Sequence, residues 1–131
     1  MTLPSRPGRA ERDDGGAFSA YRPRPDVQLE EFTLAIHHVV LFRFADGTDP
    51  VAVEAMADAL RHLPSLIPQV AEYAVGPDLG VSEGSWDFAV SARFASLEDF
   101  GTYRSHPEHQ AVISEHIEPI TVERRSVQFE Y

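Results

Sequence analysis

The stretch Ile36-His-His-Val-Val-Leu-Phe-Arg-Phe44 decides the fold, because it has the pattern of a β-strand with apolar side chains on both faces. Side chains along a strand alternate between the two faces of its sheet. The first face would present Ile36, His38, Val40, Phe42 and Phe44, and the second His37, Val39, Leu41 and Arg43. A strand with one wet face shows polar residues throughout one of these sets. We therefore expect helices to cover the first face and something else to cover at least part of the second.

A helix is predicted directly after this strand. Thr48-Asp49-Pro50 offers a capping side-chain oxygen and then a proline at the first helical position. The residues that follow form one apolar stripe at spacings of three and four. Its members are Val53, Met56, Ala57, Leu60 and Leu63. Pro64 predicts that the helix stops there.

Three further strands are predicted, at residues 70–75, 86–94 and 122–129, from β-prone residues between turn-rich segments. The strand at 86–94 alternates clearly. Its bulky face would hold Trp86, Phe88, Val90, Ala92 and Phe94. We expect this whole face to join the helix-covered side of the sheet.

Two short helical segments are predicted between the last two strands. Ser96-Leu-Glu-Asp99 resembles a capping box, and Leu97, Phe100 and Tyr103 would form the buried stripe of the first segment. His106-Pro107 then breaks the chain, with His106 as a cap, and the second segment reaches about Ile117. On this segment the side chain of His109 shares an inward face with apolar neighbours.

The order strand, helix, strand, strand, helix, strand predicts an α+β domain with a ferredoxin-like, four-stranded antiparallel sheet and both helical layers on one side. One helical layer cannot cover two faces. The remaining face would hold Val39, Leu41 and Ala89. The simplest cover is the same face of a second copy, which predicts a homodimer through the sheet.

Residues 1–31 differ from the rest of the chain in composition. They are rich in Pro, Gly and Arg, show no periodicity, and are predicted to be a disordered N-terminal extension. The folded domain is expected at 35–131. Of the net charge of −10, nearly all belongs to residues 32–131, which hold fifteen acidic groups against six arginines. An acidic domain disfavours nucleic-acid partners, since these are bound through basic patches.

Other features limit the location and the chemistry. The chain has no cysteine, which excludes disulfides, thiolate zinc sites and cysteine nucleophiles and fits a reducing cytoplasm. No apolar run reaches the roughly 20 residues of a membrane span, and the N-terminus lacks the apolar core of a signal peptide. The sequence predicts a cytoplasmic protein without a membrane partner. It also lacks phosphate-binding glycine loops, dinucleotide fingerprints and nucleophile elbows.

Three motifs together resemble the stress-responsive A/B barrel domain family, or Dabb, over residues 35–131. They are the strand 36–44, the Gly76-x-Asp78 loop with Ser82-Glu-Gly-Ser-Trp-Asp87, and Tyr103-x-x-His106-Pro-x-His109. The resemblance implies a dimeric α+β barrel, in agreement with the homodimer predicted from the uncovered face.

One branch of this family is similar to polyketide cyclases that close an aromatic ring without a cofactor. There the last histidine of the His-Pro-x-His motif is the proposed base and the tyrosine before the motif assists it; here these are His109 and Tyr103. His38 matches a histidine that lines the pocket. A tyrosine and a histidine of the cyclases are replaced here by Leu60 and Phe88, which implies a drier pocket.

Two interpretations of His109 stay open at this point. Burial lowers a histidine pKa, so a neutral imidazole could act as a base near pH 7. Alternatively, His109 is a core histidine that is hydrogen-bonded to Tyr103 or to a backbone carbonyl. Tyr103 needs a hydrogen-bond partner in either case, and His109 or His38 is the natural candidate.

The first functional hypothesis is an apolar pocket for a small hydrophobic or aromatic ligand, with cofactor-free acid/base chemistry by His109 and Tyr103. The expected ligand-binding residues are His38, Val40, Phe42, Phe88, Val90, Val112 and Ile113. The alternative is a non-catalytic stress-response or assembly protein whose pocket is filled by its own side chains. If the protein is an enzyme, a cyclase or lyase is favoured over a cofactor-free monooxygenase.

A metal site is not expected, although His106, His109 and His116 lie close together in the sequence. On one helix, His109 and His116 would stand roughly 10 Å apart along the axis. Two nitrogens that share a zinc ion must each lie about 2 Å from it. Pro107 would place His106 before the first helical turn.

Overall fold

The computed structural model of the protein describes residues 35–131, so the extension predicted at 1–31 lies outside the described residues. The elements follow in the order β1 (Ile36–Phe44), α2 (Pro50–Leu66), β2 (Val70–Pro77), β3 (Phe88–Phe94), α3 (Leu97–Ser105), α4 (Pro107–Val112), η3 (Ile113–Ile117) and β4 (Thr121–Glu130). The element η3 is a short π-helical turn that continues α4.

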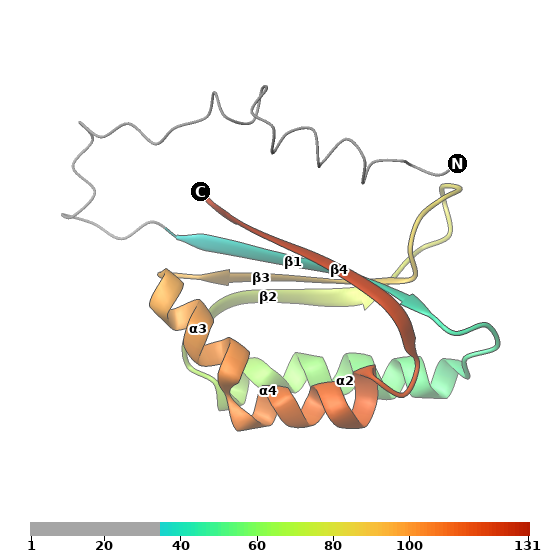
Figure 1. The fold of residues 1–131 in the computed structure, drawn as a ribbon, viewed down its shortest axis with the longest axis horizontal. Helices are drawn as coiled ribbons and strands as arrows, with labels where there is room; N and C mark the ends of the chain where they lie inside the picture. The colour runs from blue at the N-terminus through green and yellow to red at the C-terminus, as the bar shows by residue number, and fades with distance from the viewer. Residues whose placement is uncertain (1–34) are drawn as a thin grey trace, which may run out of the picture. The chain divides into compact units, whose positions relative to one another are not determined.

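The four strands form one antiparallel sheet in the order β2-β3-β1-β4. Figure 1 shows α2, α3 and α4 together on one side of this sheet. This arrangement confirms the predicted ferredoxin-like α+β fold. The central strand β1 pairs with β3 on one side and with β4 on the other, so the stretch that decided the fold is also its structural centre.

The two faces of the sheet follow from the strand register, because residues opposite each other in an antiparallel pair point to the same side. We call the helix-covered side the inner face. It presents Ile36, His38, Val40 and Phe42 from β1, Phe88, Val90, Ala92 and Phe94 from β3, and Arg124, Ser126 and Gln128 from β4. We call the other side the outer face. It presents His37, Val39, Leu41 and Arg43 from β1, Ala89, Ser91 and Arg93 from β3, and Glu123, Arg125, Val127 and Phe129 from β4.

Helix α2 supplies much of the cover for the inner face. It begins as predicted, since the Asp49 carboxylate accepts a hydrogen bond of 2.9 Å from the Val51 N–H and Pro50 is the first helical residue. Its residues Met56, Ala57, Leu60 and Leu63 are buried. The predicted stop at Pro64 is wrong. The helix continues to Leu66 because the buried Ile67 closes the last turn through a 2.9 Å bond from its N–H to the Leu63 carbonyl.

Strand bounds differ from the prediction in β2 and β3, and β4 is one residue longer at each end than predicted. Strand β2 extends to Pro77, which an edge strand tolerates because its missing N–H is not needed for pairing. Strand β3 begins only at Phe88, so its alternation does not extend back to Trp86. The expectation that Trp86 joins the helix-covered side is therefore wrong. Its ring lies beneath the Arg43 guanidinium, 4.8 Å from the ring centroid, and Arg43 belongs to the outer face.

The segment between β3 and β4 is capped twice by side chains, as its sequence predicts. Ser96 Oγ accepts a 3.0 Å bond from the Asp99 N–H, and His106 Nδ1 accepts one of 3.1 Å from the Glu108 N–H. Phe100 and Tyr103 are buried, but Leu97 is 66% exposed, so its expected place in the buried stripe is wrong. Leu97 directly follows the Ser96 cap and lies in the first turn of a short helix.

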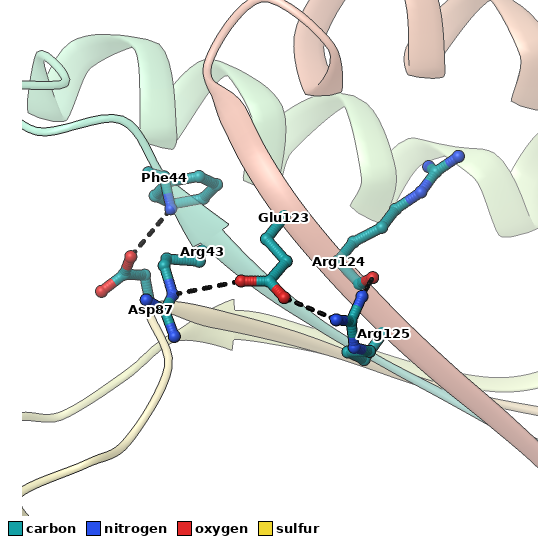
Figure 2. A network of polar contacts seen from close by, with 6 residues as sticks. All are labelled: Arg43, Phe44, Asp87, Glu123, Arg124 and Arg125. Carbon is teal, nitrogen blue, oxygen red and sulfur yellow. Dashed lines mark hydrogen bonds and ion pairs between the residues drawn. The ribbon is translucent and has the colours of Figure 1, made fainter. Parts of the chain in front are cut away.

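Side-chain contacts tie the start of β3 and the start of β4 to the end of β1 (Figure 2). The Asp87 carboxylate accepts a 2.8 Å bond from the Phe44 N–H, and the Glu123 carboxylate pairs with both Arg43 and Arg125. These contacts lie where the β1–β4 pairing shifts register between Arg43 and Phe44.

The outer face is not covered by any helix of residues 35–131 (Figure 1). Leu41, Val127 and Phe129 are 41%, 55% and 46% exposed, although they lie in the middle or at the end of paired strands. None of the helices in the described part of the chain is long and apolar enough to span a membrane.

Candidate functional site

A cavity of about 490 Å³ lies between the inner face of β1 and β4 and the helices on that side. Its apolar lining consists of Val40, Phe42, Leu60, Val90, Phe100, Ile113 and Ile117, and its polar lining of His38, Tyr103, Arg104, His109, Gln110, Glu118, Arg124, Ser126 and Gln128. Of the expected ligand-binding residues, Phe88 and Val112 are absent from this lining and lie buried in the core. The volume is within the range of roughly 300–1,000 Å³ typical of small-molecule sites.

His109 lies in α4 with its imidazole at the cavity wall. Its Nδ1 is 3.1 Å from the Arg104 carbonyl oxygen, which can only accept, so Nδ1 carries the proton. In the neutral ring Nε2 then has a free lone pair. Within residues 35–131, Nε2 has no hydrogen-bond partner, and it is not among the buried atoms that lack one, so it remains accessible. In this tautomer the accessible nitrogen, Nε2, is the one that can accept a proton.

Tyr103 packs its ring on the imidazole of His109, with centroids 4.2 Å apart and planes inclined by 35°. Its hydroxyl bonds instead to the hydroxyl of Tyr73 on β2, at 2.9 Å. The expected bond from Tyr103 to His109 or His38 is therefore not formed. Burial raises the pKa of Tyr103 to about 12 and raises that of Tyr73 further, so both phenols stay protonated at neutral pH.

His38 lies on β1, and its ring packs beside Phe100 with centroids 5.0 Å apart. Its Nδ1 is 2.8 Å from the Oε1 atom of Gln128, which faces it across the β1–β4 pair. As an amide oxygen only accepts, this bond also puts the proton on Nδ1. His38 and His109 thus line one cavity, and each is held through Nδ1.

Burial is the main reason why the pKa values of His38 and His109 lie below the usual range for histidine. The hydrogen bonds to Gln128 and to the Arg104 carbonyl oppose this effect only in part, while the positive charges of Arg104 and Arg124 add to it. Both imidazoles are therefore neutral at pH 7, and each can accept a proton.

Sequence reasoning missed the polar wall that β4 gives to this cavity. Arg124, Ser126 and Gln128 lie opposite Phe42, Val40 and His38 in the sheet, so they share the inner face. Their alternation with Glu123, Arg125 and Val127 was visible in the sequence. Only the pairing of β4 with β1 shows which of these two sets of side chains faces the cavity. The cavity is consequently more polar than the replacement of two cyclase residues by Leu60 and Phe88 implied.

The turn η3 also contributes to the wall of the cavity. The buried Ile117 and the half-buried Ile113 both line the cavity from the π-helical turn. Such turns in α-helices are frequent at functional sites. Among the residues that the structure describes, no three His, Asp or Glu side chains converge as a metal site would require.

Comparisons with known proteins agree with the fold of the domain. The family model of the Stress responsive A/B Barrel Domain, Dabb, matches residues 36–131. The chain belongs to this family. The Dabb domain of this protein is 30% identical over 86 residues to a stress-response A/B barrel domain-containing protein of Arabidopsis thaliana, a match that covers 65% of this chain and 32% of the relative. The chain thus spans about a third of that relative's length.

Solved structures support the same assignment. A protein of unknown function from Thermobifida fusca, described as dimeric and ferredoxin-like, is 36% identical, with a TM-score of 0.70 and coverage of 85% of this chain and 100% of that one. The hydroxynitrile lyase of Passiflora edulis has a TM-score of 0.67 at 18% identity and covers 75% of this chain and 94% of its own. At that identity the likeness concerns the fold alone.

Proposed function

We propose that this Dabb protein binds a small hydrophobic or aromatic molecule in the cavity between sheet and helices and removes a proton from it without a cofactor. His109 is the base, acting through Nε2. The observation that carries this proposal is the bond from His109 Nδ1 to the Arg104 carbonyl, which leaves Nε2 accessible on a ring that lines a cavity of about 490 Å³.

The low pKa of His109 also supports the proposal, because a neutral imidazole is ready to accept a proton at pH 7. His38 lines the same cavity in the same protonation state and is the second candidate to exchange a proton with the ligand. A hydroxynitrile lyase with the same fold is a precedent for an enzyme on such a scaffold.

Tyr103 assists His109 in this proposal by contact rather than by a hydrogen bond. Its ring fixes the orientation of the imidazole, and its bond to Tyr73 holds the ring in place. When Tyr73 is the donor in this bond, the hydroxyl proton of Tyr103, which lines the cavity, is left to donate to a ligand oxygen.

A test uses 5-nitrobenzisoxazole, a flat aromatic probe. When a base removes its ring C–H proton, the N–O bond breaks and a coloured nitrile-phenolate forms. We expect a saturable wild-type rate that falls about 100-fold in His109→Gln, the lower end for loss of a general base. His62→Gln, at an exposed histidine of α2, should retain the rate.

An unchanged rate in His109→Gln would contradict the proposed base. Binding of the probe, detected as a thermal shift, without turnover would favour the alternative of a non-catalytic stress-response or assembly protein. The open cavity supports ligand binding over the pocket filled by its own side chains that this alternative assumes.

The protein is further proposed to be a cytoplasmic homodimer that pairs through the outer face. The exposed apolar side chains of Leu41, Val127 and Phe129 support this, since their exposure in a monomer leaves apolar area in water. The Thermobifida fusca relative, whose whole length is covered by the match, is described as dimeric.

A further inference from the structure

Residues 35–131 contain six arginines, and their ion pairs divide them into two groups. Four are paired: Arg43 and Arg125 with Glu123, Arg61 with Glu54 and Asp58, and Arg93 with Glu72. Arg104 and Arg124 form no ion pair with any carboxylate of the described residues. Both line the cavity of His109.

This division is unexpected in an acidic domain. Fifteen carboxylates against six arginines give each guanidinium many possible partners on the surface. The two that pair with no carboxylate of residues 35–131 come from separate elements, Arg104 from α3 and Arg124 from β4, and both line one cavity. Two guanidiniums at one cavity can bind the anionic group of a ligand taken up from solution.

Arg124 and Arg125 show the same division between adjacent residues. The Arg125 guanidinium lies on the outer face, 2.7 Å from the Glu123 carboxylate. The Arg124 side chain extends away from this network (Figure 2) and shares the inner face with Phe42. Because side chains alternate along β4, Arg124 lines the cavity, whereas Arg125 forms an ion pair on the outer face.

The charges of the lining also limit the ligand. With both histidines neutral, the charged residues of the cavity are Arg104, Arg124 and Glu118, which sum to one positive charge. The positive charges of the two guanidiniums help to lower the pKa values of the lining histidines, Arg104 that of His38 and Arg124 that of His109. A ligand with a single negative charge would balance this site.

We propose that the ligand of this cavity is an acid, an aromatic or hydrophobic molecule whose carboxylate is bound between Arg104 and Arg124 while its body packs on the apolar lining. This inference rests on the proposed function and names its substrate class. An anchored carboxylate fixes which end of the molecule faces His109. It also compensates the two guanidiniums, which would otherwise oppose formation of an imidazolium there.

The test compares 2-naphthoate with 2-naphthamide, which have the same ring system and differ in charge, by calorimetric titration at pH 7.5 and low salt. We expect the wild-type protein to bind the acid about tenfold more tightly, as charge-assisted hydrogen bonds are stronger than neutral ones. Arg104→Gln and Arg124→Gln should each weaken acid binding about fivefold and leave amide binding unchanged. In the double variant the preference for the acid should disappear.

Arg125→Gln is the matched control, one residue from Arg124 but on the outer face, and should keep the preference. Arg104→Lys and Arg124→Lys retain the charge and should keep most of it, which separates charge from folding effects. Equal binding of acid and amide, or a preference that survives the double variant, would overturn this inference and leave the proposed function standing. Failure of both probes to bind the wild-type protein would overturn both.

Discussion

The inner and outer faces of the sheet are built from the same strands, yet they differ in what covers them. On β1, Ile36, Val40 and Phe42 are 8% exposed or less, whereas Leu41, between two of them, is 41% exposed. Helices cover the first set, and no helix of residues 35–131 covers the second. The inner face therefore stabilises the single chain, while the outer face leaves apolar area exposed, as the proposed homodimer requires.

The inner face itself has two parts. Along β3 it is dry and closely packed, with Phe88, Ala92 and Phe94 buried and outside the cavity lining. Along β4 it turns polar, and there the cavity opens. A domain of this size can leave such an opening because the rest of the face supplies enough core.

The largest expected effect comes from truncation of the dry part. Phe94 is fully buried against the rings of Phe100 and Tyr103, at centroid distances of 5.5 and 5.1 Å. Phe94→Ala should lower the free energy of unfolding by about 3–5 kcal/mol, measured by urea denaturation. Phe129→Ala, on the outer face, is the matched control and should cost far less at concentrations where the protein is a monomer. Equal losses would remove the distinction between the two faces.

The second prediction concerns the proposed role of the outer face. Val127→Glu places a charge beside Val39 in the proposed seam, where an unpaired buried carboxylate is strongly unfavourable. Light scattering should give twice the 14.6 kDa chain mass for the wild-type protein and a single chain mass for the variant. Ser126→Glu, one residue away on the inner face, should remain a dimer. A monomeric wild-type protein at micromolar concentration would contradict the proposed dimer.

Much of the fold could be predicted from periodicity and caps. The pattern of residues 36–44, the Asp49 and Ser96 caps and the apolar stripe of α2 depend on contacts within a few residues, and the structure confirms each of them. The prediction failed where a distant contact decides. Ile67 extends α2 past Pro64, and the late start of β3 moves Trp86 away from the inner face.

The candidate site was less accessible to such reasoning. Periodicity could place His109 and Tyr103 on inward faces, but it could not assign the hydroxyl of Tyr103 to Tyr73, which is 30 residues away on another element. The polar wall of β4 was likewise hidden, since a strand's alternation does not tell which of its faces is the inner one. That choice needs the register of β4 with β1.

The third prediction examines the bond that supports the site from behind. Tyr73→Phe removes one hydroxyl and leaves that of Tyr103 buried without its partner, at an expected cost of about 1–3 kcal/mol in the free energy of unfolding. Because Tyr103 would lose part of its fixation, the rate with 5-nitrobenzisoxazole should also fall, by less than in His109→Gln. Thermal unfolding and the probe assay measure the two effects. A fall in stability with an unchanged rate would limit the pair to a structural role.

The smallest effect is expected from pH, and it concerns the two histidines of the cavity. The pKa values of His38 and His109 in the folded protein lie below the value of about 6.5 for an unfolded histidine. Between these values the unfolded chain binds more protons, so the stability from neutral burial is fully present above pH 6.5 and is lost as the pH falls toward the folded pKa values. Urea denaturation from pH 7.5 to 5.5 should show this loss, reduced in the double variant His38→Gln, His109→Gln. The control His62→Gln, at an exposed position of α2, should follow the wild-type curve. If the double variant lost stability as steeply as the wild-type protein, the two cavity histidines would not be the groups that titrate.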